Sequence, residues 1–173
     1  MITYMIALAS PEWKPSPYTG ENGLYCAVQP DDGSKFRIMR LCEELGITTD
    51  HRKLHCTLVY SRNDAPPLEE VQGCVDRATS GRVNFIEYWE GHDKEGYLVA
   101  KLVSDKLQVC HERLIRAGAR HSFTPYSPHV TLTTGLPMTD GLKAKIDEVN
   151  RRLAEESIYV NFDDFTISDI KED

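Results

Sequence analysis

Two short stretches of the chain carry a histidine followed two residues later by a threonine, inside runs that are otherwise apolar. The first, KLHCTLVYSR at residues 53–62, holds His55 and Thr57, and the second, PHVTLTT at residues 128–134, holds His129 and Thr131. In a β-strand, residues i and i+2 point to the same side. Each stretch therefore presents an imidazole and a hydroxyl on one face of a strand.

These residue types fit the chemistry of phosphate esters. A neutral imidazole can remove a proton from an attacking hydroxyl or water, while a second, protonated imidazole supplies one to the leaving oxygen. Histidine suits both roles because its ordinary pKa is about 6.5. Threonine hydroxyls can donate hydrogen bonds to phosphoryl oxygens as negative charge develops on them. Such a site requires neither a metal nor a cofactor, and the sequence does not say which histidine is the acid.

Strict alternation gives each strand two distinct faces. In the first motif Thr57 and Val59 are expected on the same side as His55, with Leu58 and Tyr60 on the opposite, packed side. The second motif alternates in the same way. The alternative interpretation is that both histidines are buried core residues with satisfied hydrogen bonds, but this leaves the doubled pattern unexplained.

The hydrophobic periodicity predicts an α+β chain with alternating strands and amphipathic helices. A stretch rich in Pro, Gly and Ser at residues 10–23 is expected to be a loop that could act as a lid. Strands are predicted at residues 3–9, 23–29, 54–61, 82–89, 97–103, 129–134 and 158–167, and helices at 34–45, 68–78, 107–118 and 142–153.

The order of elements contains an internal repeat. A strand, a helix that stops at a glycine, and a His-x-Thr strand occur twice, with 30 residues from Tyr25 to His55 and 32 from Tyr97 to His129. This self-similarity predicts two lobes related by a pseudo-twofold axis, each with an antiparallel sheet and outer helices. The absence of a clear linker favours one bilobal domain over residues 1–173, with the two motifs facing a central cleft.

Composition narrows the possible environments and partners. The 173 residues include 20 basic and 27 acidic side chains, a net charge of −7, which argues against binding of long nucleic acid. No apolar run is long enough for a membrane span. The five cysteines include no CxxC pair, and four of them lie in periodic apolar patterns, which is typical of reduced core cysteines in a cytoplasmic protein. A small anionic partner held by a few directed contacts remains compatible with this charge.

The stretches GLYCAV, KLHCTLVYSR and SPHVTLTT resemble the 2H phosphoesterase superfamily, and within it the phage anti-CBASS phosphodiesterases. The resemblance covers nearly the whole chain in element order, and its sharp part is the two motifs. It implies a bilobal α+β fold and a catalytic set of His55, Thr57, His129 and Thr131. It also implies metal-independent cleavage of cyclic di- or trinucleotide messengers, such as 3′,3′-cyclic GMP-AMP, in the cytoplasm of an infected bacterium.

Aromatic residues near the motifs are candidates for contacts with the bases of such a substrate. Tyr25 lies on the first strand of the repeat, Trp89 ends a predicted strand, and Tyr126 just precedes the second motif. Ordinary packing is the alternative for each. Of the other histidines, His111 is expected on a helix face, and His121 in a turn without partners.

Three other functions remain open. The same site could open 2′,3′-cyclic phosphates at RNA ends, and a basic groove for the RNA strand would favour that function. A non-catalytic sponge could sequester a cyclic nucleotide in the same cleft, although binding alone does not need a paired acid and base. A purely structural protein is the remaining alternative, and the oligomeric state is not predicted.

Overall fold

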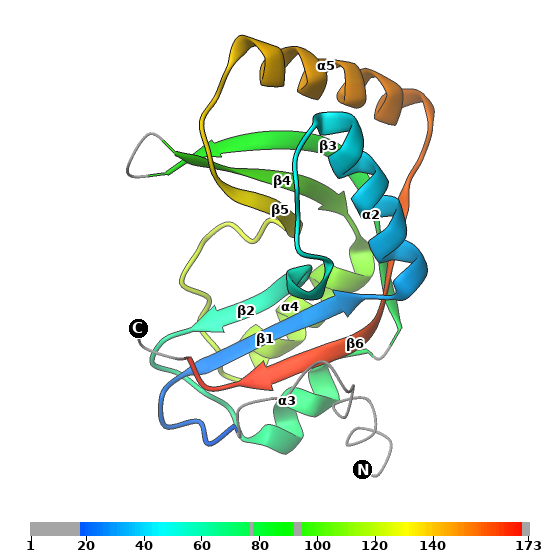
Figure 1. Cartoon of the computed structure of the whole chain (residues 1–173). Coiled ribbons are helices and arrows are strands. Elements are labelled where there is room, and N and C mark those ends of the chain that lie inside the picture. Colours follow the sequence, from blue (N-terminus) through cyan, green and yellow to red (C-terminus); the bar gives the residue numbers. More distant parts are fainter. Residues whose placement is uncertain (1–17, 77, 92–94, 171–173) are drawn as a thin grey trace.

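The computed structural model describes residues 18–76, 78–91 and 95–170 (Figure 1). The predicted strand at residues 3–9 and most of the predicted loop at 10–23 lie outside these ranges. The strands are β1 (Leu24–Pro30), β2 (Cys56–Ser61), β3 (Thr79–Glu90), β4 (Gly96–Val103), β5 (His129–Leu136) and β6 (Tyr159–Ser168). The helices are α2 (Asp32–Leu45), η1 (His51–Lys53), α3 (Leu68–Cys74), α4 (Asp105–Arg116) and α5 (Asp140–Glu155).

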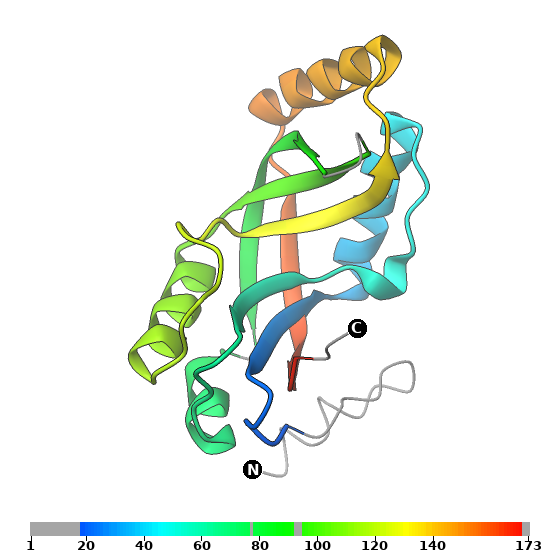
Figure 2. The same cartoon turned by 90° about the vertical axis from the view of Figure 1, so that its left-hand side faces the viewer.

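The predicted α+β class is confirmed, and the two halves of the repeat are arranged as equivalent units. All strand pairs are antiparallel, in the closed order β1-β2-β5-β4-β3-β6. Exchanging β1 with β4, β2 with β5 and β6 with β3 leaves every neighbour relation unchanged. The repeated units β1-α2-β2 and β4-α4-β5 therefore occupy corresponding places in the two three-stranded halves (Figures 1 and 2).

Two strand pairs join the halves, β3 with β6 and β2 with β5, and they differ in length. β3 and β6 share four paired positions, whereas β2 and β5 meet only at Cys56 and Val130. Beyond that pair the two motif strands diverge, and the yellow-green segment between α4 and β5 runs beside β2 (Figure 1). The motif strands are therefore held together at one point and open beyond it.

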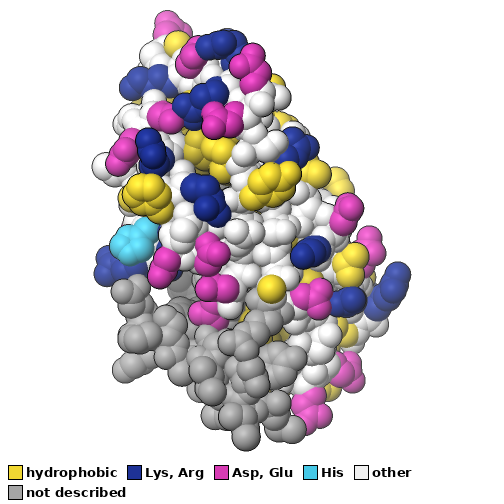
Figure 3. Space-filling view, turned by 90° about the vertical axis from the view of Figure 1, so that its right-hand side faces the viewer, with side chains coloured by type: hydrophobic (Ala, Val, Ile, Leu, Met, Phe, Trp, Pro, Cys, Tyr) yellow, Lys and Arg dark blue, Asp and Glu magenta, His cyan; other side chains and the backbone are white. Residues whose placement is uncertain are grey.

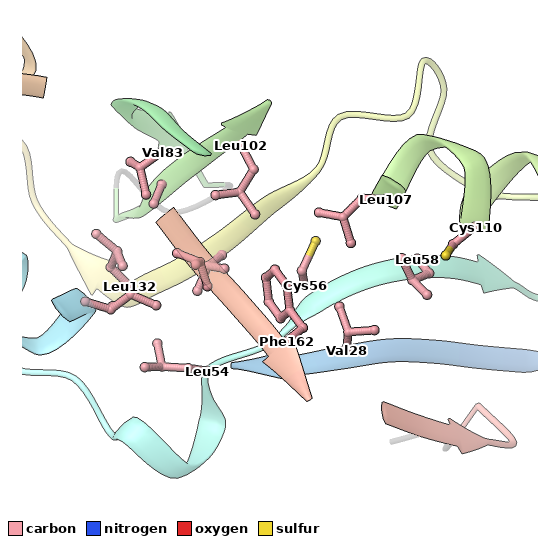
Figure 4. Packing of buried hydrophobic residues seen from close by; sticks show 14 of the residues in the cluster. Val28, Leu54, Cys56, Leu58, Val83, Leu102, Leu107, Cys110, Leu132 and Phe162 are labelled. Carbon is pink, nitrogen blue, oxygen red and sulfur yellow. The ribbon is translucent and has the colours of Figure 1, made fainter. Parts of the chain in front are cut away.

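The interior is filled from both halves, as the alternating pattern requires. Phe162 on β6 lies among side chains from neighbouring strands, including Val28 and Cys56 (Figure 4). Val130 and Leu132 are buried from the second motif strand. Burial of these apolar positions fixes the register of each strand, because a slip of one residue would move them to the opposite face.

Helix ends follow local capping chemistry. α2 begins where the Asp31 side chain accepts a hydrogen bond from the Ser34 amide, at 2.7 Å, and ends at Gly46 with a left-handed φ of 69°. Glycine adopts this conformation without a steric penalty, so the predicted stop is explained by its backbone. The predicted helix at 68–78 ends early, at Cys74, because Val75 adopts an extended conformation and β3 starts at Thr79.

Candidate active site

Thr57 lies on β2, and His129 and Thr131 lie on the neighbouring strand β5, whereas His55 immediately precedes β2, which begins at Cys56 rather than at the predicted residue 54. His129 and Thr131 are half-buried, while Val130 and Leu132 between and after them are buried. Cys56 and Leu58 are likewise fully buried beside half-buried motif residues on β2. In both strands, therefore, the apolar side chains anchor the interior and the motif side chains lie on the other face.

The two histidines are held in the same way. The Nδ1–H of His55 donates to the carbonyl oxygen of Lys53, and that of His129 donates to the carbonyl oxygen of Ser127, both at 2.8 Å. A carbonyl oxygen can only accept, so Nδ1 of each ring carries a proton. In the neutral form each ring then keeps a free lone pair on Nε2. This tautomer allows Nε2 to accept or return a proton.

The surroundings of His129 favour its neutral form. Burial lowers its pKa, and the positive charges of Lys101 and of protonated His55 lower it further, against a raising effect of the Ser127 carbonyl. Trp89 contacts the imidazole nearly edge to face, with ring centroids 4.6 Å apart. The ammonium of Lys101 lies 5.5 Å from the centre of the Trp89 ring. His129 is therefore the more enclosed of the two histidines.

Tyr25 has a comparable position beside His55. Its ring meets the imidazole edge to face, with ring centroids 6.1 Å apart. Burial raises the pKa of Tyr25 to about 12, so its hydroxyl stays protonated at neutral pH. Tyr25 and Trp89, chosen from the sequence as aromatic candidates, thus contact different motif histidines.

A cavity of about 300 Å³ opens beside the second motif, where β2 and β5 diverge. Of the residues predicted from the sequence, it is lined by Thr57, Trp89, Tyr126 and His129. Its other lining residues were not predicted, and come from β2 and from the segment that leads into β5: Tyr60, His121, Phe123, Pro125 and Ser127. His55, Thr131 and Tyr25 are not among its lining residues.

Tyr126 lines the cavity and is held in place by contacts on two sides. Its hydroxyl donates to the Thr57 carbonyl oxygen at 2.9 Å, and its ring stacks on His111 with centroids 4.0 Å apart and planes 7° apart. One face of the ring is therefore covered by α4. Burial raises the pKa of Tyr126 far above its usual range, so the hydroxyl remains a donor.

The prediction that His121 lacks partners was wrong. The backbone N–H of Tyr60 donates to His121 Nδ1 at 3.0 Å, and the ring contacts His111 and Tyr126. The sequence signal was the aromatic and proline-rich run HSFTPYSP at residues 121–128, directly before the second motif. Loops are frequently where ligand-binding residues lie.

The expected faces near the end of β2 were also partly wrong. The β1–β2 register shifts opposite Leu58, pairing Cys26 with Val59 and Ala27 with Thr57. Such an irregularity reverses the alternation beyond it. Val59 is consequently buried, and Tyr60 lies on the cavity side with Thr57 rather than in the packed interior.

The described residues contain neither a metal-binding cluster nor a helix able to span a membrane. Within the described ranges, no cluster of three or more His, Cys, Asp or Glu side chains has an arrangement that could hold a metal ion. No helix in the same part of the chain is long and apolar enough to span a membrane.

Comparison with known proteins identifies the family. Residues 22–161 match the family model described as anti-CBASS protein Acb1. The anti-CBASS protein Acb1 of Vibrio phage KVP40 is 32% identical over 124 residues, covering 69% of this chain and 78% of the phage protein. That of Enterobacteria phage T4 is 31% identical over 113 residues, covering 64% of this chain and 71% of the relative.

Among solved structures, similar chains include one described as a phosphoesterase and E. coli LigT in its apo form. Each is 16% identical with a TM-score of 0.43, and the alignments cover 69% and 68% of this chain and 76% and 74% of theirs, respectively. The family model and the phage relatives, rather than these distant structures, carry the assignment. The resemblance that the paired His-x-Thr motifs indicated is thereby confirmed: the chain belongs to the anti-CBASS protein Acb1 family.

Proposed function

We propose that this protein is a metal-independent phosphodiesterase that cleaves 3′-5′ bonds of cyclic di- and trinucleotide messengers such as 3′,3′-cyclic GMP-AMP. The observation that carries the proposal is the matched pair of imidazoles, each with Nδ1–H tied to a backbone carbonyl and Nε2 left for proton transfer. The two threonines complete the set. Membership of the anti-CBASS family supports a cyclic nucleotide as the substrate.

The two histidines have different roles in this proposal. His129 acts as the general base, because its lowered pKa keeps Nε2 unprotonated at neutral pH. His55 acts as the general acid and gives its Nε2 proton to the leaving 5′ oxygen. The hydroxyls of Thr57 and Thr131 donate to the phosphoryl oxygens, on which charge accumulates in the transition state.

Two forms of the reaction use the same groups. In one, His129 removes the proton of the adjacent 2′-hydroxyl, the 2′ oxygen bonds to phosphorus, and the bond from phosphorus to the 5′ oxygen breaks. The product is then a linear nucleotide ending in a 2′,3′-cyclic phosphate. In the other, His129 activates a water molecule that attacks phosphorus directly. Identification of the first product by mass spectrometry distinguishes them, because only direct hydrolysis incorporates ¹⁸O from labelled water in that step.

Charge supports a small substrate over an RNA strand. The net charge is −7, and on the face shown in Figure 3 the Lys and Arg side chains of the described residues are interspersed with Asp and Glu. A continuous basic track is what a long polyanion would require. We accordingly propose that the enzyme acts on a free cyclic nucleotide. The reaction would take place in the cytoplasm of a bacterium infected by a phage that encodes the enzyme.

The decisive experiment incubates the protein with 3′,3′-cyclic GMP-AMP in EDTA, beside an RNA oligomer ending in 2′,3′-cyclic phosphate. His55→Ala and His129→Ala are each expected to lower kcat for the dinucleotide by roughly 10²–10⁴-fold. His51→Ala is the matched control, since this exposed histidine lies in η1, outside both motifs.

Each alternative predicts another result. Cleavage of the RNA end alone would assign the site to RNA processing. Tight binding of the dinucleotide without turnover would make the protein a sponge and remove the catalytic assignment. A requirement for added metal would contradict the proposed mechanism even if the substrate were correct.

A further inference from the structure

The segment between α4 and β5 replaces the strand pairing that β2 lacks. Beyond its single pair with Val130, the edge of β2 has no strand partner in β5. Instead the Tyr126 hydroxyl donates to the Thr57 carbonyl, and His111 Nδ1–H donates to the Leu58 carbonyl at 2.7 Å. Side chains thus satisfy backbone groups that would otherwise face the cavity unpaired.

A hydrogen bond at the same edge of β2 determines which ring nitrogen of His121 carries the proton. A backbone N–H can only donate, so the 3.0 Å contact from the Tyr60 N–H requires an unprotonated Nδ1 on His121. The Ser122 N–H donates to the Tyr60 carbonyl at 2.9 Å and anchors the neighbouring backbone. The neutral imidazole therefore carries its proton on Nε2, the opposite tautomer from His55 and His129.

His121 remains neutral under ordinary conditions. Burial lowers its pKa to about 4, and the nearby His111 contributes to the shift. The side chain lines the cavity, and within the described ranges its Nε2 has no hydrogen-bond partner. His121 thus adds an uncharged ring N–H, held in place by the Tyr60 N–H, to the residues that line the cavity.

The walls around this donor are aromatic. Phe123 is 62% exposed at the cavity, although it is a large apolar side chain, and its ring lies 6.0 Å from that of Tyr60. At 5.9 Å it also contacts the His121 ring. An exposed aromatic ring beside an imidazole N–H donor is a combination that can hold a flat heteroaromatic ring by stacking and by its edge.

We propose that His121 is a specificity-determining residue whose Nε2–H donates to a ring nitrogen of one adenine base of the substrate, seated against Phe123. The assignment rests on the proposed function, because it takes the substrate to be a cyclic oligonucleotide. A cavity of about 300 Å³ is large enough for one base but not for a whole cyclic dinucleotide. The scissile phosphate then lies toward His129, which borders the same cavity.

A base fits this position better than a phosphate. A phosphate group would be bound by charged donors, whereas His121 is neutral and its neighbours Tyr60 and Phe123 are aromatic. A fixed N–H donor forms a hydrogen bond to a ring nitrogen of adenine but not to a base edge that presents an amino group to it. His121 therefore selects among bases rather than adding to phosphate affinity.

The test combines changes in the protein and in the substrate. Cyclic di-AMP is compared with analogues in which adenine N1, N3 or N7 is replaced by CH, in the wild type and in His121→Asn. The asparagine oxygen can still accept from the Tyr60 N–H, while the Nε2 donor is lost. His111→Asn is the matched control, since His111 belongs to the same cluster but does not line the cavity.

In the wild type, one of the three replacements is expected to lower kcat/KM about 10-fold, the value of one hydrogen bond. In His121→Asn the parent substrate should lose a similar factor, mainly through KM, and the same replacement should then have no further effect. His111→Asn should retain the full penalty. Equal penalties in wild type and His121→Asn would overturn the assignment, as would three replacements without effect in the wild type.

A measurement on the unmodified protein tests the assignment without relying on variants that could misfold. ¹⁵N NMR of the histidine rings should show His121 protonated at Nε2 and His55 and His129 at Nδ1. Addition of a phosphorothioate analogue of cyclic di-AMP should shift the His121 Nε2–H signal. An Nδ1-protonated His121, or a signal unchanged at saturation, would overturn the inference. If the wild type neither bound nor cleaved any cyclic dinucleotide, the proposed function itself would fail, and this assignment with it.

Discussion

Lys101 and His129 face each other across the β4–β5 pair, and the ammonium of Lys101 lowers the pKa of the imidazole. The lysine also donates to the Ser127 hydroxyl, while the Ser127 carbonyl holds His129 Nδ1–H. Ser127 therefore orients the imidazole of His129, and Lys101, which is hydrogen-bonded to Ser127, supplies the positive charge beside it. This arrangement distinguishes the second motif from the first, although the two sequences look equivalent.

Removal of that charge should move the pH dependence of catalysis. As a general base, His129 must be unprotonated, so activity is lost when the pH falls through its pKa, which lies below 6.5. Without the positive charge this pKa rises, and the acidic limb of the kcat/KM profile should shift to higher pH in Lys101→Met. Lys101→Arg keeps the charge and should leave the limb near its wild-type position. An unchanged limb in Lys101→Met would separate this lysine from the catalytic base.

Thr57 should contribute to catalysis through its hydroxyl rather than its volume. It lines the same cavity as His129. Thr57→Val keeps the shape and should lower kcat by roughly 10²–10³-fold, whereas Thr57→Ser should retain most activity. Steady-state kinetics with 3′,3′-cyclic GMP-AMP provide the measurement, and comparable loss in both variants would indicate a packing role instead.

Asn150 should stabilise the fold at the other joint of the strand ring. From α5 its side chain accepts from the Ile86 N–H at 2.6 Å and donates to the Ile86 carbonyl at 2.9 Å, beyond the last β3–β6 pair. Asn150→Ala leaves both backbone groups without these partners and should cost about 1–3 kcal/mol in urea unfolding. Arg151→Ala, which removes only an exposed ion pair with Glu148, is the control and should leave the midpoint unchanged.

The cysteines should be unreactive in the native protein. All five are free and buried, one more than the four that the sequence pattern placed in the core, and burial raises the pKa of both Cys42 and Cys56 to about 12. Thiolate is the reactive form, so labelling by Ellman's reagent at pH 8 should be slow until the chain unfolds. In guanidinium chloride all five should react. Rapid labelling of the native protein would show that a core strand or helix opens readily.

Several features of this protein were determined by local sequence. The alternation around His55 and His129 predicted both motif strands, and Gly46 predicted the end of α2. The repeated strand-helix-strand order predicted two corresponding halves. These features follow from backbone periodicity and from the left-handed conformation at Gly46, which depend on residues a few positions apart.

The asymmetry of the candidate site was decided only by the tertiary structure. Three contacts between different strands and loops create it. A register shift between β1 and β2 moves Tyr60 to the cavity, Lys101 places a positive charge beside His129, and His121 accepts a hydrogen bond from the Tyr60 N–H. The sequence presents two equivalent motifs because each one encodes only its own strand. The lowered pKa of His129 arises from neighbours brought together by folding, since burial and Coulomb interaction depend on distance in space rather than along the chain.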